Sequence, residues 1–235
     1  MPFWSNKRLV SFAALAVSTL LLFSLLSHSF TERATPAAVL PDGRTVILDA
    51  GHGGKDAGAI GVNGVLEKDL NLAVTLLLAE RLRAAGVRVI LTREDDELLL
   101  TEEEKKGTGK KARDLANRLA IAKQNEGALF VSIHMNSFPI EKYKGLEVYY
   151  AADATSQAVA RAVMKRVKED LNPDNTRTAK ATNGSIYLLD NAVTPAVLVE
   201  CGFLSNAEDA AKLSDKDYQK ELSFCLFCAI MEVEF

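Results

Sequence analysis

From residue 45 onward, short apolar segments rich in β-branched residues alternate with longer segments whose apolar residues recur every three or four positions. The short segments have the length and composition of buried strands, and the longer ones have the period of amphipathic helices. This alternation is typical of an α/β fold. The predicted strands cover 45–50, 87–93, 128–134, 145–151, 185–190 and 195–200, and the predicted helices cover 67–86, 110–127, 156–172 and 215–233.

Strands that alternate with helices usually pair in parallel, and the connecting helices cover the sheet. The sequence therefore predicts a twisted, mostly parallel β-sheet with helices on both faces, formed as a single domain by residues 44–235. The charged segment 94–111 interrupts the alternation and is interpreted as a solvated loop, with a flexible lid as the alternative. A chain of 235 residues with 48% apolar composition fits one domain and a small attachment, because domains usually have about 100–200 residues.

The N-terminal pattern differs, because residues 9–27 contain no charged side chain. An apolar run of this length can cross a bilayer as a helix. The basic pair Lys7 and Arg8 precedes the run and should stay in the cytoplasm, so the remaining chain is expected on the extracytoplasmic side. We interpret 1–30 as an uncleaved transmembrane anchor and 31–43 as a linker; the alternative is a cleaved signal sequence and a secreted protein.

The net charge and the cysteines exclude some classes of function and of stabilisation. The formal net charge is −3, so the chain has no basic excess for binding nucleic acid. Three cysteines, Cys201, Cys225 and Cys228, cannot all pair within one chain, so disulfides are not expected to hold the fold. Cys225 and Cys228 form a C-x-x-C in an apolar segment without a second ligand pair, which favours a buried helix face over a metal or redox motif.

Two histidines directly follow or end predicted strands. His52 lies in GHGG after the strand 45–50, and His134 ends the strand 128–134. A single histidine of this kind is usually a hydrogen-bonded structural residue. However, α/β sheets bind their ligands at the carboxyl ends of the strands. Two histidines in equivalent positions therefore favour a shared site over coincidence.

Two glutamates are positioned to complete such a site. Glu67 begins the predicted helix 67–86, where interaction with the helix dipole is the simpler explanation, but the preceding loop returns the chain from His52 to this point. Two imidazoles and one carboxylate with an open fourth position are a ligand set of catalytic zinc, so His52, Glu67 and His134 are candidate ligands of one Zn²⁺ per chain. Glu200, at the end of the apolar strand 195–200, is the candidate general base.

The motifs around these residues resemble a known family. GHGGKDAG, GVLEKDL, SIHMN and VECGFLSN look like those of the zinc-dependent N-acetylmuramoyl-L-alanine amidases of the amidase-3 type, and the resemblance extends from Thr45 to the C-terminus. It implies zinc ligation by His52, Glu67 and His134, with Glu200 as the catalytic glutamate. It also implies that the substrate is peptidoglycan, hydrolysed at the amide between the lactyl group of N-acetylmuramic acid and L-alanine.

Other segments are similar to one branch of this family. SFPIEKYKGLEVYY, DNTRTAK and SIYLLDNAVTPAVLVECGFLSN resemble the membrane-anchored, germination-specific amidases of spore formers, which implies a role in cortex maturation through formation of muramic δ-lactam. The chain departs from the commoner pattern at Cys201, whose sulfur would compete for the metal if it pointed inward. It has no long insertion between His134 and Glu200 that could form an inhibitory domain, which leaves control by a separate activating protein open.

Two other functions fit part of the pattern. A zinc peptidase acting on stem peptides could use similar ligands, although no H-E-x-x-H string is present. A non-catalytic peptidoglycan-binding protein could retain the fold with a decayed site, although all four site residues remain. The dispersed ligand set favours the amidase.

Overall fold

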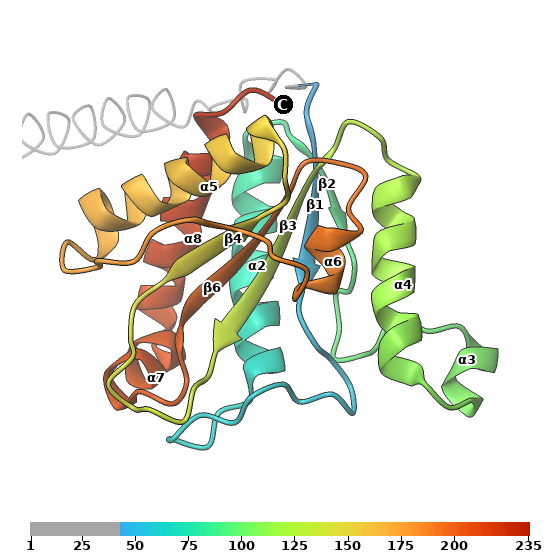
Figure 1. Ribbon diagram of the computed structural model, residues 1–235, viewed down its shortest axis with the longest axis horizontal. Coiled ribbons are helices and arrows are strands. Elements are labelled where there is room, and N and C mark those ends of the chain that lie inside the picture. The colour runs from blue at the N-terminus through green and yellow to red at the C-terminus, as the bar shows by residue number, and fades with distance from the viewer. Residues whose placement is uncertain (1–42) are drawn as a thin grey trace, which may run out of the picture. The chain divides into compact units, whose positions relative to one another are not determined.

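The computed structural model describes residues 43–235, which form one α/β domain (Figure 1). Its strands are β1 (Thr45–Ala50), β2 (Arg88–Leu91), β3 (Leu129–Asn136), β4 (Glu147–Tyr150), β5 (Lys180–Ala181) and β6 (Ala196–Phe203). Its helices are α2 (Glu67–Ala84), α3 (Glu102–Lys106), α4 (Lys110–Lys123), α5 (Ala154–Arg166), α6 (Tyr187–Asp190), α7 (Ala207–Ser214) and α8 (Lys216–Met231). A π-helical turn, η1 (Val167–Leu171), continues α5.

The described strands form one mixed sheet in the order β2-β1-β3-β6-β4-β5. Strands β2, β1, β3 and β6 are parallel to one another. Strand β4 runs antiparallel to β6, and the short β5 pairs in parallel with β4 at the edge. The predicted α/β domain is confirmed, and its parallel part extends from the edge strand β2 to β6.

Helices cover both faces of this sheet (Figure 1). Successive residues of a strand point to opposite faces. On one face, Leu48 and Val131 belong to a buried cluster with apolar residues of α2, α5 and α8. On the other face, Ile47 and Phe130 belong to a second cluster with residues of α4 and α6. The core therefore has two layers, one on each side of the sheet, as the sequence predicted.

Capping side chains define where several helices begin. Asp153 accepts a hydrogen bond from the backbone N–H of Ser156 at the start of α5. Asn206 accepts one from the N–H of Asp209 in α7, and Asp215 caps α8 in the same way. These caps stabilise the helix starts because first-turn amides have no partner within the helix.

The prediction of a strand at 185–190 is wrong, because this segment contains the short helix α6. Its start is held by Asp190, which accepts hydrogen bonds from the backbone N–H groups of Gly184 and Ile186. A short apolar run has too few residues for its period to distinguish strand from buried helix. For the same reason the two-residue strand β5 gave no recognisable pattern.

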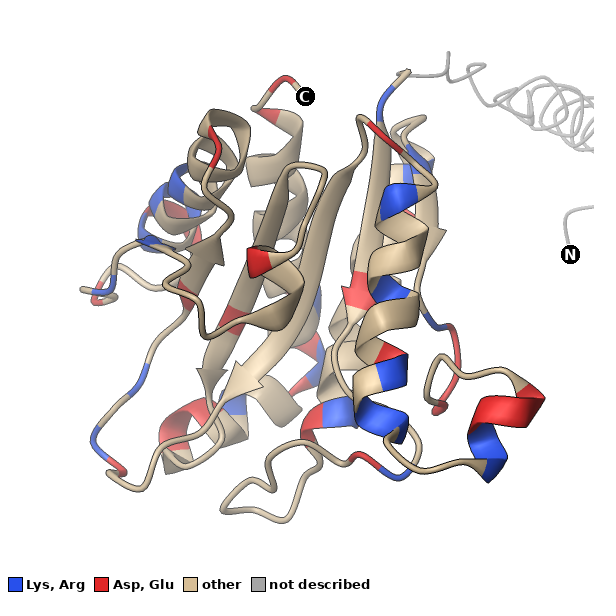
Figure 2. Cartoon of the chain, turned by 45° about the vertical axis from the view of Figure 1, so that its right-hand side comes forward, with Lys and Arg blue, Asp and Glu red and all other residues tan. Residues whose placement is uncertain are grey.

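The segment 94–111 is not a loop throughout, because it contains α3 and the start of α4. A capping box formed by Thr101 and Glu104 begins α3. Its first turn is acidic and its last turn basic, which suits the helix dipole, and Figure 2 shows these red and blue segments one after the other along α3. The remainder is tied to α4 by a 2.6 Å hydrogen bond from the N–H of Leu99 to Asp114 Oδ1.

All three cysteines are unpaired. Cys201 and Cys225 lie in the apolar cluster between the sheet, α2, α5 and α8, so the C-x-x-C belongs to a helix face as predicted. Since Cys201 follows Glu200 directly along β6, the two side chains point to opposite faces of the sheet. The concern that Cys201 could offer its sulfur to a metal is therefore unfounded.

The expected anchor at 1–30 and all but the last residue of the expected linker at 31–43 lie outside the described residues. Within residues 43–235, no helix has both the length and the apolar character needed to span a bilayer. The proposed boundaries of these N-terminal segments stay predictions.

Replacing Leu78 by Ala should destabilise the domain by about 2–5 kcal/mol, because this side chain is fully buried between α2 and the sheet. Leu76→Ala, on the same helix but with 38% of the residue exposed, is the matched control and should cost less than about 1 kcal/mol. Urea unfolding of both variants measures the difference. Equal losses would show that α2 does not bury the face described.

Candidate metal centre and active site

His52 lies in a tight turn at the end of β1. Its φ is 60°, a left-handed conformation that is uncommon for a residue other than glycine. A Cβ on the preceding residue, Gly51, would lie 2.3 Å from Nε2 of His134, so only glycine allows the two histidine segments to approach. The ring centroids of His52 and His134 are 5.0 Å apart.

Glu67, the first residue of α2, lies between the two histidines. Its Oε1 is 3.2 Å from His52 Nε2 and 3.0 Å from His134 Nδ1. The carboxylate also accepts backbone N–H hydrogen bonds from Met135 and Ala59. Although burial opposes ionisation, the hydrogen bonds and charges of His134 and His52 hold the pKa of Glu67 well below its usual range. Glu67 is therefore an anion held in place by both histidine segments.

His52, Glu67 and His134 form a group that can hold a metal ion, since their ligand atoms all lie within 4.8 Å of one another. Bonds of about 2.0–2.2 Å in a tetrahedral site would separate ligand atoms by roughly 3.4 Å, so a small adjustment brings all three onto one ion. Imidazole nitrogens and a carboxylate oxygen suit Zn²⁺. The donor set therefore fits zinc.

Glu200 lies next to this group on β6. It is the in-register partner of His134 in the parallel pair β3–β6, where neighbouring strands are about 4.8 Å apart. Its Oε2 is buried without a hydrogen-bond partner. Burial raises the pKa of Glu200 to about 7; His134 opposes this shift and Glu67 adds to it. A carboxyl group with such a pKa can accept and return a proton near neutrality.

Glu147 is a charged neighbour of Glu200 that was not singled out from the sequence, although a charged residue within an apolar strand was an available signal. It pairs with Glu200 across β4 and β6. Its Oε2 lies 2.7 Å from Arg177 Nη1 and 2.8 Å from Lys180 Nζ, and its Oε1 accepts a hydrogen bond from Asn136. Burial opposes ionisation, but these partners hold the pKa of Glu147 below its usual range. Glu200 therefore has a fixed negative charge beside it.

Asp56, in the motif GHGGKDAG, was also not singled out from the sequence. Its Oδ2 lies 3.0 Å from His52 Nδ1 and 3.2 Å from Lys111 Nζ. The carboxylate lies close to the His52 ring, although the two groups are not aligned as a well-directed hydrogen bond. Burial disfavours the charged ring, but Glu67 and Asp56 together raise the pKa of His52 above its ordinary value. A carboxylate on one ring nitrogen orients the other toward a metal.

A buried ion-pair network centred on Arg118 supports the turn at His52. Arg118 Nη1 lies 2.6 Å from Asp49 Oδ1, and its Nε lies 2.8 Å from Asp114 Oδ2. Arg118 also donates hydrogen bonds to the backbone carbonyls of Ala50 and His52. This role of Arg118 was not predicted, because arginine within an amphipathic helix ordinarily faces solvent.

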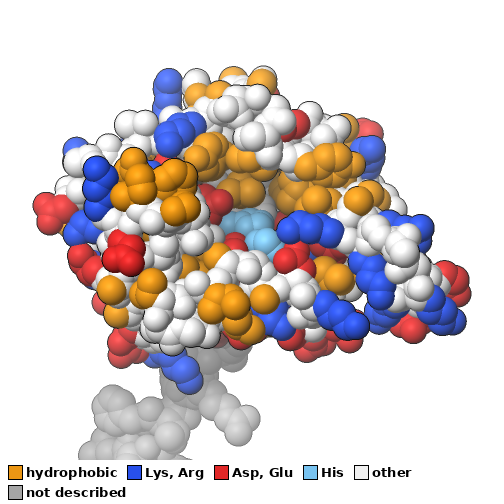
Figure 3. All heavy atoms as spheres, turned by 60° about the horizontal axis from the view of Figure 1, so that its bottom comes forward, with side chains coloured by type: hydrophobic (Ala, Val, Ile, Leu, Met, Phe, Trp, Pro, Cys, Tyr) orange, Lys and Arg blue, Asp and Glu red, His pale blue; other side chains and the backbone are white. Residues whose placement is uncertain are grey.

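The histidines lie in a hollow of the molecular surface (Figure 3). This hollow is a cavity of about 280 Å³ lined by His52 and His134 together with residues of α4 and α6. Tyr187, which is 49% exposed, and Lys111 form part of its wall. The site is therefore accessible from the surface at the carboxyl edge of the sheet.

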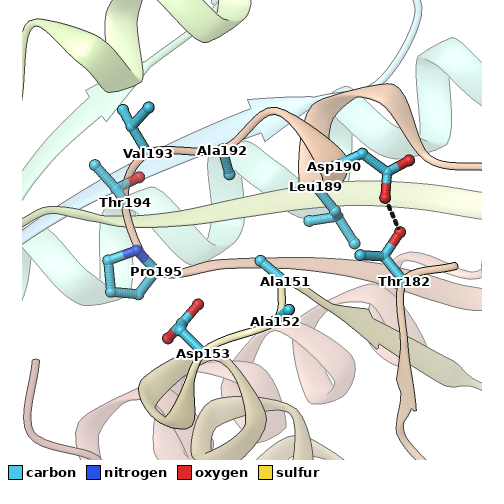
Figure 4. Close-up of a pocket in the computed structure, with 10 residues that line it drawn as sticks. All are labelled: Ala151, Ala152, Asp153, Thr182, Leu189, Asp190, Ala192, Val193, Thr194 and Pro195. Atoms are coloured by element: carbon cyan, nitrogen blue, oxygen red, sulfur yellow. Dashed lines mark hydrogen bonds between the residues drawn. The ribbon is translucent and has the colours of Figure 1, made fainter. Parts of the chain in front are cut away.

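A second cavity, of about 510 Å³, lies at the C-terminal end of α6 (Figure 4). Its two carboxylates, Asp153 and Asp190, accept hydrogen bonds from the hydroxyls of Ser156 and Thr182. No histidine lines it, so its larger volume does not make it the better candidate for the reaction.

Two imidazoles and a carboxylate can bind a metal ion, and a neighbouring glutamate that exchanges protons can act as a general base in hydrolysis. These groups lie at the carboxyl ends of the strands, where α/β enzymes bind their substrates. The chain is thus a hydrolase by its fold and site. Residues 46–232 match the family described as N-acetylmuramoyl-L-alanine amidase (Amidase_3), and the chain belongs to this family. It acts on peptidoglycan at the amide between N-acetylmuramic acid and L-alanine. The resemblance noted in the motifs is confirmed, and family membership favours the amidase over both alternatives.

The chain is similar to two amidases of Bacillus subtilis (strain 168). It is 34% identical over 215 residues to the germination-specific N-acetylmuramoyl-L-alanine amidase of Bacillus subtilis (strain 168), with 90% of each chain covered. It is 35% identical over 182 residues to the amidase LytC of the same organism, covering 75% of this chain and 33% of LytC.

Solved structures show the same fold. The CwlD amidase from Clostridioides difficile, in complex with the GerS lipoprotein, has a TM-score of 0.76 and 40% identity, covering 80% of this chain and 97% of that one. The catalytic domain of CwlV from Bacillus (Paenibacillus) polymyxa var. colistinus has a TM-score of 0.66 and 31% identity, covering 80% of this chain and 97% of that one.

Glu200→Gln should stabilise the metal-free domain at pH 8.5 but not at pH 5. The pKa of Glu200 is about 7 in the folded state against the usual 4.5, so folding stability falls as pH rises between these values, and glutamine removes that fall. The gain should be on the order of 2–3 kcal/mol by urea unfolding in chelator. Exposed Glu141→Gln is the control and should show no such pH dependence. An equal effect of Glu200→Gln at both pH values would contradict the raised pKa.

Proposed function

We propose that the chain is a zinc-dependent amidase in which His52, Glu67 and His134 hold one Zn²⁺ and Glu200 is the general base. The observation that carries this proposal is the position of Glu200, which is in register with His134 on the adjacent strand and therefore lies on the same face of the sheet as this candidate ligand. A general base has to be within reach of both the attacking water and the leaving nitrogen.

Bound zinc would polarise the lactyl carbonyl and make the attacking water more acidic. Glu200 takes the proton from this water and returns it to the alanine nitrogen as the amide bond breaks. A pKa near 7 suits both transfers, and a bound cation would favour the ionised, proton-accepting form. Asp56 keeps the His52 ring oriented, and Glu67 provides the anionic ligand. Since water is the nucleophile, no covalent enzyme intermediate is required.

The proposal extends to spore cortex, where removal of stem peptides would prepare muramic acid for δ-lactam formation. It is supported by similarity over 90% of both chains to a germination-specific amidase. Mutant spores lacking the chain should then contain cortex without δ-lactam, which mass spectrometry of cortex fragments measures.

We also propose that residues 1–30 anchor the chain in the membrane, with the catalytic domain on the extracytoplasmic side, and that an activating protein controls it. The anchor is supported by the uncharged run at 9–27. The partner is supported by the CwlD amidase of Clostridioides difficile, whose structure is a complex with a lipoprotein. Protease protection in intact cells tests the first proposal, and digestion assays with and without the cognate lipoprotein test the second.

Digestion of purified peptidoglycan should release free stem peptides and leave muramic acid without peptide. Glu200→Gln should lower the rate by about 10²–10⁴-fold because proton transfer loses its positioned base. It should still bind zinc, whereas His134→Ala should lose both zinc and activity. Mass spectrometry of the digest and metal analysis of the purified proteins provide the two measurements.

The matched control for this experiment is Glu141→Gln, an exposed glutamate on the loop after β3, which should retain full activity. Products cut within the stem peptide would replace the amidase with a peptidase. A Glu200→Gln enzyme that remains active would remove Glu200 from the mechanism and leave the family assignment intact.

A further inference from the structure

Arg93, two residues beyond the end of β2, is a buried cation whose side chain donates its hydrogen bonds to backbone carbonyls. Its residue exposure is 6%, and none of the ion pairs found within residues 43–235 includes it. Its Nε donates to the carbonyl of Ala50 at 2.8 Å, and its Nη1 donates to that of Asp95 at 3.0 Å. Its Nη2 donates to the carbonyls of Gly51 at 3.0 Å and Lys68 at 2.8 Å.

The last two carbonyls belong to the segments that carry metal ligands. Gly51 directly precedes His52, and Lys68 directly follows Glu67. One nitrogen of Arg93 therefore bridges the turn at the end of β1 and the first turn of α2. Asn71 strengthens the same link, because its Nδ2 donates to the Gly51 carbonyl at 3.1 Å and to Glu67 Oε1 at 3.3 Å.

The hydrogen bonds of Arg93 lie next to a strained part of the backbone, the turn at His52. His52 has a left-handed φ of 60°, which costs free energy and persists only where the surroundings impose it. Arg118 donates to the carbonyls of Ala50 and His52, and none of its hydrogen bonds or ion pairs within residues 43–235 reaches α2. Arg93 connects the turn to the helix bearing Glu67, together with Asn71 and with Lys68, whose Nζ donates to the Gly54 carbonyl at 2.8 Å.

A positive charge close to a cation site opposes cation binding, so a purely electrostatic role for Arg93 would be counterproductive. Its planar fork, by contrast, reaches carbonyls in several directions at once, which the single ammonium of lysine cannot do. The value of Arg93 therefore lies in its hydrogen-bond geometry.

We propose that Arg93, assisted by Asn71, is a positioning residue that holds His52 and Glu67 at ligand distance before a metal binds. This inference rests on the proposed binding of zinc by His52, Glu67 and His134. Loss of the bridge lets the two ligand segments separate, so that metal binding has to reorder them and the affinity falls.

Zinc affinity of the full-length chain, measured by chelator competition after metal removal, tests this proposal. Arg93→Lys keeps the positive charge but removes the planar guanidinium group, and it should weaken zinc binding by about 10–100-fold. Its complex with Co²⁺, used as a spectroscopic probe, should show visible absorption bands that differ from those of the unaltered chain. The matched control is Arg81→Lys on the far end of α2, where Arg81 donates to the Ser223 hydroxyl and the Lys220 carbonyl. This control should bind zinc within about twofold of the unaltered chain.

A folded Arg93→Lys variant with zinc affinity and Co²⁺ spectrum like those of the unaltered chain would overturn the proposal, even if its thermal stability were lower. If Arg93→Lys does not fold, the zinc affinity of Asn71→Ala is measured instead. A clear loss of affinity supports the proposed link between the His52 turn and α2, and unchanged affinity overturns it. Failure of the unaltered chain to bind zinc would instead refute the proposed function on which the inference rests.

Discussion

The site depends on the parallel, in-register pairing of β1, β3 and β6. Parallel strands end at the same edge of a sheet, so the polar residues that end them converge. The register then selects which face they share: Asp49 pairs with Ser132, and His134 pairs with Glu200. A slip of one residue in β6 would exchange Glu200 with Cys201 and turn the carboxyl into the apolar core. Helix α2 brings Glu67 back to the same edge and completes the group.

Two buried carboxyl groups at this edge of the sheet have pKa values shifted in opposite directions. Glu147 and Glu200 are the same residue type on neighbouring strands, paired in register. Glu147 has Arg177 and Lys180 against its carboxylate and stays ionised. Glu200 has no such cation, and its pKa rises to about 7. The difference lies in the deeper burial of the Glu200 carboxyl group and in its lack of a neighbouring Lys or Arg, and it separates a structural anion from a group able to exchange protons near neutrality.

Much of the fold could be predicted because its elements are long and periodic. The central strands β1, β3 and β6 and the helices α2, α4 and α8 lie where the alternation of apolar and polar residues indicated. The errors concern short elements: α3, β5 and α6 have too few residues for a period to be recognised. The two histidines, Glu67 and Glu200 could be singled out because each stands at a strand end or helix start, where a polar side chain is not needed for packing.

The sequence by itself determined the α/β class, the family and the four residues that gather at the sheet edge, because local period and motif depend on neighbours along the chain. Only the tertiary structure decided which charges are paired, such as Asp56 with His52 and Glu147 with Arg177. It also decided which carboxyl is left without a cation and that Arg93 links two ligand segments. These contacts join residues distant in sequence, and their distances follow from how the sheet and helices pack, which no local pattern records.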